Sequence, residues 1–249
     1  MQTNNILGID VGASGIKGAI VDLEIGDLTT ERLKLDTPQP SNTTAMAETV
    51  AELVRQIGYE GELIGCGFPA VVKKGVSHSA ANIDDSWKGA NIEEIFSRAT
   101  GKRVLAVNDA DAAGLAEMKY GKGKGLKGSV LLITIGSGLG SALFTNGHLV
   151  QNTEFGHCNL HDGIAEHYVS NLARKRHDMS WEVFGLRFNE FLEMIERTVN
   201  PDLIILGGGV SNRYELFSEW ISIETEVTTA EMFNNAGIVG AAQYAFENQ

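Results

Sequence analysis

The chain has 249 residues, of which 43% are hydrophobic and 21% charged, so it has enough apolar material for one large globular domain or two smaller ones. Its net charge of -12 argues against nucleic acid as the main partner, because binding to a phosphate backbone relies on a surplus of lysine and arginine. No apolar run reaches the roughly 18 residues that a membrane-spanning helix needs, so we expect no membrane partner.

The first half of the chain begins with a predicted β-hairpin that is rich in glycine. Apolar patterning predicts strands over 6–11 and 16–23, and alternation with period two predicts a third strand over 28–36. The segments that follow are a predicted helix (46–57), a strand (62–70), a helix closed by Gly101 (92–101), a strand (102–109) and a helix (110–121).

The second half repeats this order. A strand and a hairpin partner are expected over 129–136 and 140–150, followed by further elements at 165–176 (helix), 181–199 (helix), 201–209 (strand), near Tyr214 (helix), 226–230 (extended) and 235–246 (helix). The repetition predicts two α/β domains related by duplication, 1–115 with the C-terminal helix 235–249 and 116–234, hinged near 110–121.

Two glycine-rich turns, "DVGASGIKG" and "TIGSGLGSA", lie at matching positions in the two hairpins. Neither fits a Walker loop or a dinucleotide fingerprint, because no Gly-Lys pair precedes Ser or Thr and a strand follows instead of a helix. An ordinary hairpin turn remains one interpretation. The other is an anion-binding nest in which glycines adopt positive φ. The repetition favours the nest, with these phosphate-binding candidates: Gly12, Ala13, Ser14, Gly15, Lys17, Thr134, Gly136, Ser137 and Gly138.

A polar pair, Asn108 and Asp109, stands where a buried strand ends and a helix begins. Ligands in α/β folds bind at such strand ends, and a helix N-terminus keeps a carboxylate ionised. From the residues alone, helix capping and general-base chemistry both remain open. Gly208, in the glycine run after the strand at 201–209, is expected to contact phosphate, with Ser211 capping the next helix.

Several segments together resemble a known family. The two hairpins, "NDADAAG" between them and "LGGGVS" after them are similar to the ROK (repressor, open reading frame, kinase) sugar kinases of the actin-like ATPase superfamily. "TPQP", "GFPAVVKKG", "AANIDDSWKG" and "KRHDMSW" resemble the polyphosphate glucokinase branch of that family. The resemblance covers essentially the whole chain. It implies two ribonuclease-H-like α/β domains with an interdomain cleft, and phosphoryl transfer to the 6-hydroxyl of glucose.

The resemblance also implies roles for individual residues. Asp109 would be the general base, and the sugar hydroxyls would be held by Asn82, Asn108, Asp109, Glu154, His157 and Glu166. Many ROK members carry a cysteine-rich zinc knuckle after the histidine of the E-x-G-H motif. Here His157, Cys158 and His161 lack a fourth ligand at suitable spacing, so we expect no structural zinc.

The phosphoryl donor stays open between inorganic polyphosphate and ATP, with polyphosphate favoured. Basic residues that could follow a long polyanion, or be merely solvated, are Lys122, Lys124, Lys127, Arg174, Lys175 and Arg176. Mg²⁺ is expected with the donor, held by Asp10 through water.

Other functions remain as alternatives. They are a strictly ATP-dependent glucokinase, a kinase of mannose or another hexose, and a sugar-binding protein without activity. A DNA-binding repressor is not expected, since the first strand begins by about Ile6 and leaves no room for a preceding helix-turn-helix. Two cysteines and the lack of a basic leader favour the cytoplasm, and the resemblance implies a homodimer.

Overall fold

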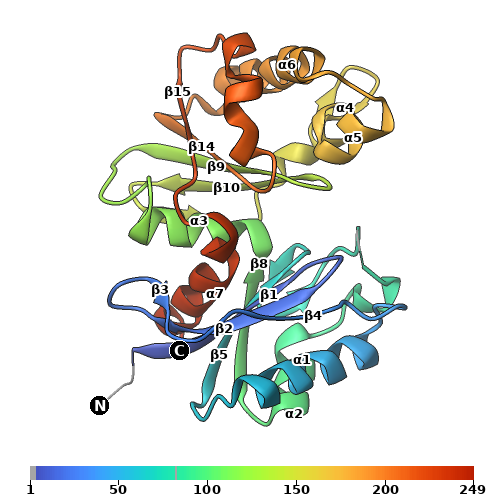
Figure 1. Cartoon of the computed structure of the whole chain (residues 1–249), viewed down its shortest axis with the longest axis vertical. Coiled ribbons are helices and arrows are strands. Elements are labelled where there is room, and N and C mark those ends of the chain that lie inside the picture. The colour runs from blue at the N-terminus through green and yellow to red at the C-terminus, as the bar shows by residue number, and fades with distance from the viewer. Residues whose placement is uncertain (1–3, 82) are drawn as a thin grey trace. The chain divides into compact units, whose positions relative to one another are not determined.

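The computed structural model describes residues 4–81 and 83–249, and the chain divides into two compact units. Unit 1 comprises Met1–Tyr120 and Asn234–Gln249, and unit 2 comprises Gly121–Phe233. The C-terminal helix therefore belongs to the same unit as the N-terminal strands (Figure 1).

The sheet of unit 1 has the order β3-β2-β1-β5-β8, with β4 also paired to β2. Its strands are β1 (Asn5–Val11), β2 (Ile16–Asp22), β3 (Asp27–Leu28), β4 (Leu33–Leu35), β5 (Leu63–Phe68) and β8 (Arg103–Asn108). The predicted hairpin is confirmed as the antiparallel pair β1–β2, and β5 and β8 extend the sheet in parallel.

The third strand predicted over 28–36 is interrupted. The Thr30 hydroxyl accepts a hydrogen bond from the Ile20 amide at 3.0 Å, so a side chain takes the place of a backbone acceptor in the ladder. Such local side-chain bonds compete with strand pairing. Two short strands, β3 and β4, result.

Four helices pack on this sheet: α1 (Thr43–Ile57), α2 (Ile92–Thr100), α3 (Asp109–Tyr120) and α7 (Ala236–Glu247). As predicted, α2 ends at Gly101, which is left-handed with φ of 68°. The hinge predicted near 110–121 coincides with α3, a continuous helix, and the first segment of unit 1 ends with the last residue of that helix. Shorter elements are β6 (Val72–Lys73), β7 (Val76–Ser77) and the 3-10 helix η1 (Asp85–Trp87).

Helix α7 lies close to the sheet because the strands beneath it carry glycine. A Cβ at Gly8 would meet the backbone of Ile238, and a Cβ at Gly65 would meet the backbone of Ala241. Figure 1 shows α7, in red, among the blue and green elements of unit 1. These close contacts fix the start of α7 relative to β1, which carries Asp10.

The sheet of unit 2 has the order β11-β10-β9-β14-β15. Its strands are β9 (Ser129–Ile135), β10 (Leu139–Thr145), β11 (His148–Val150), β14 (Leu203–Gly207) and β15 (Glu226–Thr229). An antiparallel hairpin followed by a parallel strand, β10-β9-β14, repeats the β2-β1-β5 arrangement of unit 1. This repetition agrees with the expected duplication.

The helices of unit 2 are α4 (Ala165–Val169), α5 (Asn171–Arg176) and α6 (Trp181–Val199). The helix predicted over 165–176 breaks at Ser170, whose hydroxyl accepts from the Ala173 amide and caps α5. Unit 2 also contains the small hairpin β12 (Asn159–Leu160) and β13 (Gly163–Ile164), and the 3-10 helices η2 (Phe155–His157), η3 (Ser211–Leu216) and η4 (Ser218–Trp220). A further 3-10 helix, η5 (Phe233–Asn235), spans the boundary between the two units.

The helix predicted near Tyr214 is a 3-10 segment, and Ser211 does not cap it. The Ser211 hydroxyl instead donates to the Gly208 carbonyl at 2.7 Å and closes the glycine turn that precedes it. Within residues 4–81 and 83–249, no helix is long and apolar enough to cross a membrane.

Candidate functional site

The first glycine turn joins β1 to β2 and exposes Ala13 and Ser14 at its tip. The Gly12 amide donates to the Gly15 carbonyl at 3.0 Å, and the Thr37 hydroxyl donates to the Gly12 carbonyl at 2.6 Å. Neither glycine adopts positive φ, so that expectation is wrong. A Cβ at Gly15 would meet the Lys34 side chain, so this lysine packs directly on the turn.

Asp10 lies beside this turn, and two elements hold it. Lys17 Nζ is 3.0 Å from Asp10 Oδ2. On another side, a Cβ at Gly237 would come within 3.1 Å of the Asp10 carboxyl carbon, so the first turn of α7 approaches the carboxylate closely. Asp10 therefore lies between a lysine and the first turn of a helix.

Asn108 and Asp109 lie at the junction of β8 and α3, as predicted. Asn108 is buried, and its carbonyl oxygen accepts from the amides of Ala110 and Asp111 while its amide nitrogen donates to the Ala70 carbonyl. Because that oxygen already accepts two bonds, only the second amide hydrogen of Asn108 is left for a ligand. Asp109 is half-buried, and its Oδ1 accepts from the Ala110 amide at 2.9 Å, which orients the carboxylate.

The second glycine turn joins β9 to β10 in unit 2. The Gly136 amide donates to the Gly138 carbonyl at 3.0 Å, much as Gly12 closes the first turn, and the Asn171 amide at the start of α5 donates to the Gly136 carbonyl. Ser137 is exposed at the tip and Thr134 is half-buried in β9. Here again the turn glycines lack positive φ.

Gly208 differs from the turn glycines, since its φ is 78°. A Cβ at Gly208 would also come within 2.6 Å of the Ile135 backbone. Glycine is thus needed at 208 both for conformation and for space. The close approach places this residue against the end of β9, next to the second turn.

Three of the predicted sugar-binding residues come together in unit 2. His157 Nδ1 lies 3.6 Å from Glu154 Oε2, and His157 Nε2 lies 3.7 Å from Glu166 Oε1. Glu166 Oε2 accepts from the Leu139 amide at 3.3 Å and fills the space beside Gly138. Polar groups that converge in this way suit a ligand with several hydroxyls.

The pKa of Glu154 is raised above its ordinary value. Burial is the main cause, His157 opposes the rise, and the negative charge of Glu166 adds to it. A partly desolvated carboxylate is typical of a functional site, since a charge is kept there at some cost in stability.

Other predictions fall outside this set. Asn82 lies outside the described residues. Arg174 is committed to packing, because its guanidinium carbon lies 4.3 Å from the Trp181 ring centroid and its Nη1 donates to the Met179 carbonyl. Its assignment to a polyanion-binding cluster stays a prediction. Lys122 lies 4.0 Å from Glu231.

The remaining basic candidates are exposed: Lys124, Lys127, Lys175 and Arg176. Sequence reasoning missed Lys34, Thr37 and Gly237, which reach the first turn or Asp10 from other elements. Thr37 begins the quoted "TPQP" segment, so a signal existed for it. None existed for the other two.

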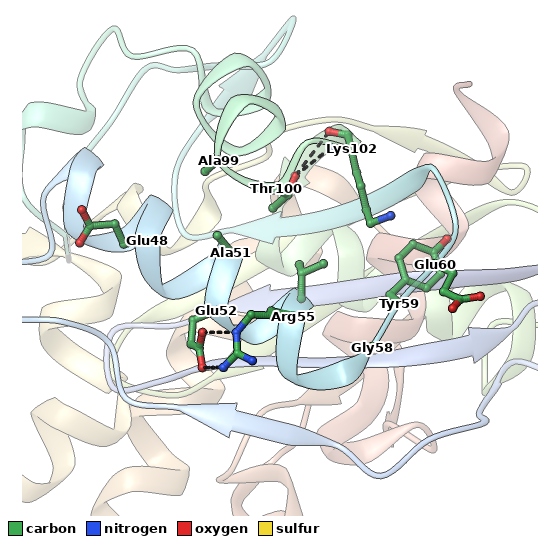
Figure 2. Close-up of a pocket in the computed structure, with 11 residues that line it drawn as sticks. Glu48, Ala51, Glu52, Arg55, Gly58, Tyr59, Glu60, Ala99, Thr100 and Lys102 are labelled. Carbon is green, nitrogen blue, oxygen red and sulfur yellow. Dashed lines mark hydrogen bonds and ion pairs between the residues drawn. The ribbon is translucent and has the colours of Figure 1, made fainter.

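A hollow of about 720 Å³ lies elsewhere in unit 1, between α1, the end of α2 and the segments that lead into β5 and β8 (Figure 2). Glu52 and Arg55 form a bidentate pair on its wall, with Arg55 Nε 2.7 Å from Glu52 Oε2. Strands β5 and β8 begin here, whereas Asn108 and Asp109 follow the other end of β8. No predicted site residue lines this hollow.

Comparison with known proteins defines the family. The model of the ROK family matches residues 6–166. The chain belongs to the ROK family. A polyphosphate glucokinase of Mycobacterium tuberculosis is 45% identical to it over 236 residues, which cover 94% of this chain and 89% of that protein.

Solved structures agree with this assignment. The inorganic polyphosphate/ATP-glucomannokinase of Arthrobacter sp. strain KM is 40% identical, with a TM-score of 0.95 over 98% of this chain and 99% of that one. A ROK family glucokinase of Streptomyces griseus, crystallised with glucose and AMPPNP, is 22% identical and shares the fold with a TM-score of 0.84 over 98% and 99% of the two chains. The predicted α/β fold and the resemblance to ROK polyphosphate glucokinases are confirmed.

Among the described residues, no group of three or more His, Cys, Asp or Glu side chains is arranged to hold a metal ion. His161 Nε2 lies 2.6 Å from Glu190 Oε2, which joins the β12–β13 hairpin to α6. The absence of a structural zinc stays a prediction for this ROK chain.

Proposed function

We propose that the chain is a sugar kinase that transfers a phosphoryl group from inorganic polyphosphate, and also from ATP, to the 6-hydroxyl of glucose. The observation that carries the proposal is the similarity, over almost the whole chain, to the polyphosphate glucokinase of M. tuberculosis and the polyphosphate/ATP-glucomannokinase of Arthrobacter. These relatives support the sequence prediction of a glucokinase-type enzyme.

Asp109 acts as the general base. It accepts the proton of the 6-hydroxyl as the oxygen of that hydroxyl bonds to phosphorus and the bond to the donor's bridging oxygen breaks. The bond from the Ala110 amide at the start of α3 orients the carboxylate.

Glu154, His157 and Glu166 bind the other hydroxyls of the sugar. Their carboxylate oxygens accept hydrogen bonds from hydroxyls and the imidazole can donate or accept. A hexose that lacks one of these hydroxyls, or presents it in another direction, leaves a partly buried polar group without its partner, and this gives the site its selectivity. Asn82 and Asn108 remain part of the proposal from the family resemblance.

The two glycine turns and Gly208 bind the phosphates of the donor, with the exposed backbone near Ser14 and Ser137 as the contact surface. When bound with the donor, Mg²⁺ neutralises charge on the phosphate oxygens. Asp10 is the residue that would hold it, and a single carboxylate already paired with Lys17 fits a contact through water, because Mg²⁺ keeps several waters.

The test is a comparison of donors on purified protein. Glucose phosphorylation is measured with long-chain polyphosphate or ATP, each with Mg²⁺ and with EDTA, and mannose replaces glucose in a parallel series. We expect glucose 6-phosphate from both donors, and activity that requires Mg²⁺. If only ATP supports activity, the protein is a strictly ATP-dependent glucokinase. If mannose is turned over faster than glucose, mannose is the preferred substrate.

Lys124 and Lys127 extend the donor site for a long polyanion. Their joint replacement by Ala is expected to raise the KM for long polyphosphate more than the KM for ATP, because only the longer donor reaches beyond the transfer site. Equal effects on both donors would remove this part of the proposal.

We also propose that the protein is cytoplasmic and forms a homodimer. Light scattering of the purified protein tests the dimer.

A further inference from the structure

Three charged side chains form a row across the sheet of unit 1. Asp10 of β1 is directly opposite Lys17 of β2, and Lys17 is directly opposite Lys34 of β4. Residues directly opposite each other in antiparallel strands share one face of a sheet. Figure 1 shows β4 alongside β2. The row therefore places Lys34 on the face that carries Asp10, beside the first glycine turn.

The two lysines of this row have different partners. Lys17 is paired with Asp10 at 3.0 Å, and 32% and 20% of these two side chains are exposed. Lys34 has Asp36 at 3.7 Å, but 50% and 93% of those side chains are exposed. An exposed ion pair contributes little, whereas the tighter pair neutralises most of the charge of Lys17. Lys34 thus keeps its positive charge at the turn.

The stem of Lys34 is held in place along the turn. A Cβ at Gly15 would collide with Lys34 Cε and would lie 3.3 Å from Lys34 Cδ, so the lysine methylenes pack directly on the Gly15 backbone. This contact places part of the stem against the turn and its ammonium group at the edge of residues 12–15, although half of the side chain is exposed. An ordered stem lowers the entropy that the lysine loses when it binds an anion.

Two lysines directly opposite each other destabilise a sheet, because like charges repel across the strands. Asp10 offsets most of this repulsion between Lys17 and Lys34, and an anion bound next to Lys34 relieves the remainder. Besides the exposed backbone near Ser14, the turn has few free donors for a polyanion, since the Gly12 amide is bonded to the Gly15 carbonyl and Lys17 is paired with Asp10.

We propose that Lys34 binds a phosphate group of the phosphoryl donor at the Gly12–Gly15 turn and supplies the positive charge that the Lys17–Asp10 pair does not. Its ammonium group offers three N–H donors and a point charge, which suits a phosphate oxygen without requiring a fixed angle. The inference rests on the proposed function, in which this turn binds the donor, and it adds a residue from another strand.

The test uses Lys34→Met, which keeps an unbranched stem over Gly15 and removes only the charge. Lys119→Met is the matched control, because Lys119 is an equally exposed lysine of unit 1 (54%) with a similarly distant carboxylate, Glu247 at 3.8 Å. Lys34→Gln is a second variant in case the first is unstable, and thermal melting checks both.

Loss of one charge-assisted contact should raise the KM for the donor about ten-fold in Lys34→Met, with the KM for glucose unchanged. Raising the ionic strength should weaken donor binding less steeply in this variant than in the wild type, because one screened attraction is gone. Lys119→Met should match the wild type in both respects.

Calorimetric titration with inorganic tripolyphosphate, without glucose, separates this inference from the proposed function. Weaker binding by both Lys34 variants than by Lys119→Met supports the inference even if turnover is absent. Equal binding and equal donor KM in all variants would overturn it, whatever the wild-type protein phosphorylates. Lack of glucose phosphorylation by the wild type would overturn the proposed function.

Discussion

Glu166 occupies the space that a side chain at position 138 would need. A Cβ on Gly138 would collide with Glu166 Oε2, the oxygen that also accepts from the Leu139 amide. The other carboxylate oxygen lies 3.7 Å from His157 Nε2. The carboxylate of Glu166 therefore contacts both the proposed sugar-binding residues and the proposed phosphate-binding turn. A substitution in the turn should alter sugar binding, and a substitution among the sugar-binding residues should alter the turn.

Gly138→Ala is expected to displace Glu166. The KM for glucose and the KM for the donor should both rise, by roughly ten-fold, because a charge-assisted contact is lost on each side. Gly163→Ala is the control, since a Cβ there meets no atom within 4 Å and φ is not positive. Steady-state kinetics with each substrate varied in turn measures the effect. A rise confined to one substrate would show that Glu166 does not link the two sets.

Asp109→Asn is expected to lower kcat by about 10²–10⁴-fold, because the amide cannot accept the hydroxyl proton. The side-chain oxygen of Asn can still accept from the Ala110 amide, so the start of α3 should remain intact. Calorimetry should therefore show glucose binding close to that of the wild type. Turnover near the wild-type rate would rule out Asp109 as the base.

Gly237→Ala is expected to lower activity without lowering the melting temperature. Alanine is favoured over glycine in a helix by up to about 1 kcal/mol, so Tm should not fall. The added methyl group would press on Asp10, whose carboxyl carbon lies 3.1 Å from the Cβ position. We therefore expect a lower kcat and a higher Mg²⁺ concentration for half-maximal activity. An unchanged Mg²⁺ requirement would argue against a role of Asp10 with the metal.

Glu154 should give glucose binding a dependence on pH. Its pKa is raised by burial, so the carboxylate gains a proton, and loses acceptor strength toward sugar hydroxyls, at a higher pH than an ordinary glutamate does. The KM for glucose should rise as pH falls through this raised pKa. Glu154→Gln should have a higher KM at neutral pH and lack this dependence.

The raised pKa of Glu154 also predicts whether Glu154→Gln is more or less stable than the wild type. A carboxyl whose pKa is higher in the folded than in the unfolded protein makes folding less favourable as pH rises between the two values. Glu154→Gln removes that cost, so its Tm should exceed that of the wild type at pH 7, and the difference should vanish below about pH 4, the ordinary value. A lower Tm at pH 7 would show that the carboxylate stabilises the fold instead.

Local sequence patterns were sufficient to predict most helices and strands. Gly101 ends α2 as predicted, and the strand-to-helix junction at Asn108 and Asp109 is where the apolar run 104–107 stops. The errors arose where a side chain or a distant segment intervenes. Thr30 interrupts the third strand, and Ser211 bonds backward to Gly208.

The sequence by itself determined the two α/β halves, their repeated glycine hairpins and the family, because periodicity, turn residues and joint motifs are local properties of a chain. Only the tertiary structure decided which side chains lie against the turns, since Lys34 and Glu166 reach Gly15 and Gly138 from another strand and a helix. It also decided which charges are neutralised, as Lys17 is by Asp10. Contacts between residues far apart in sequence depend on packing, and no local pattern encodes them.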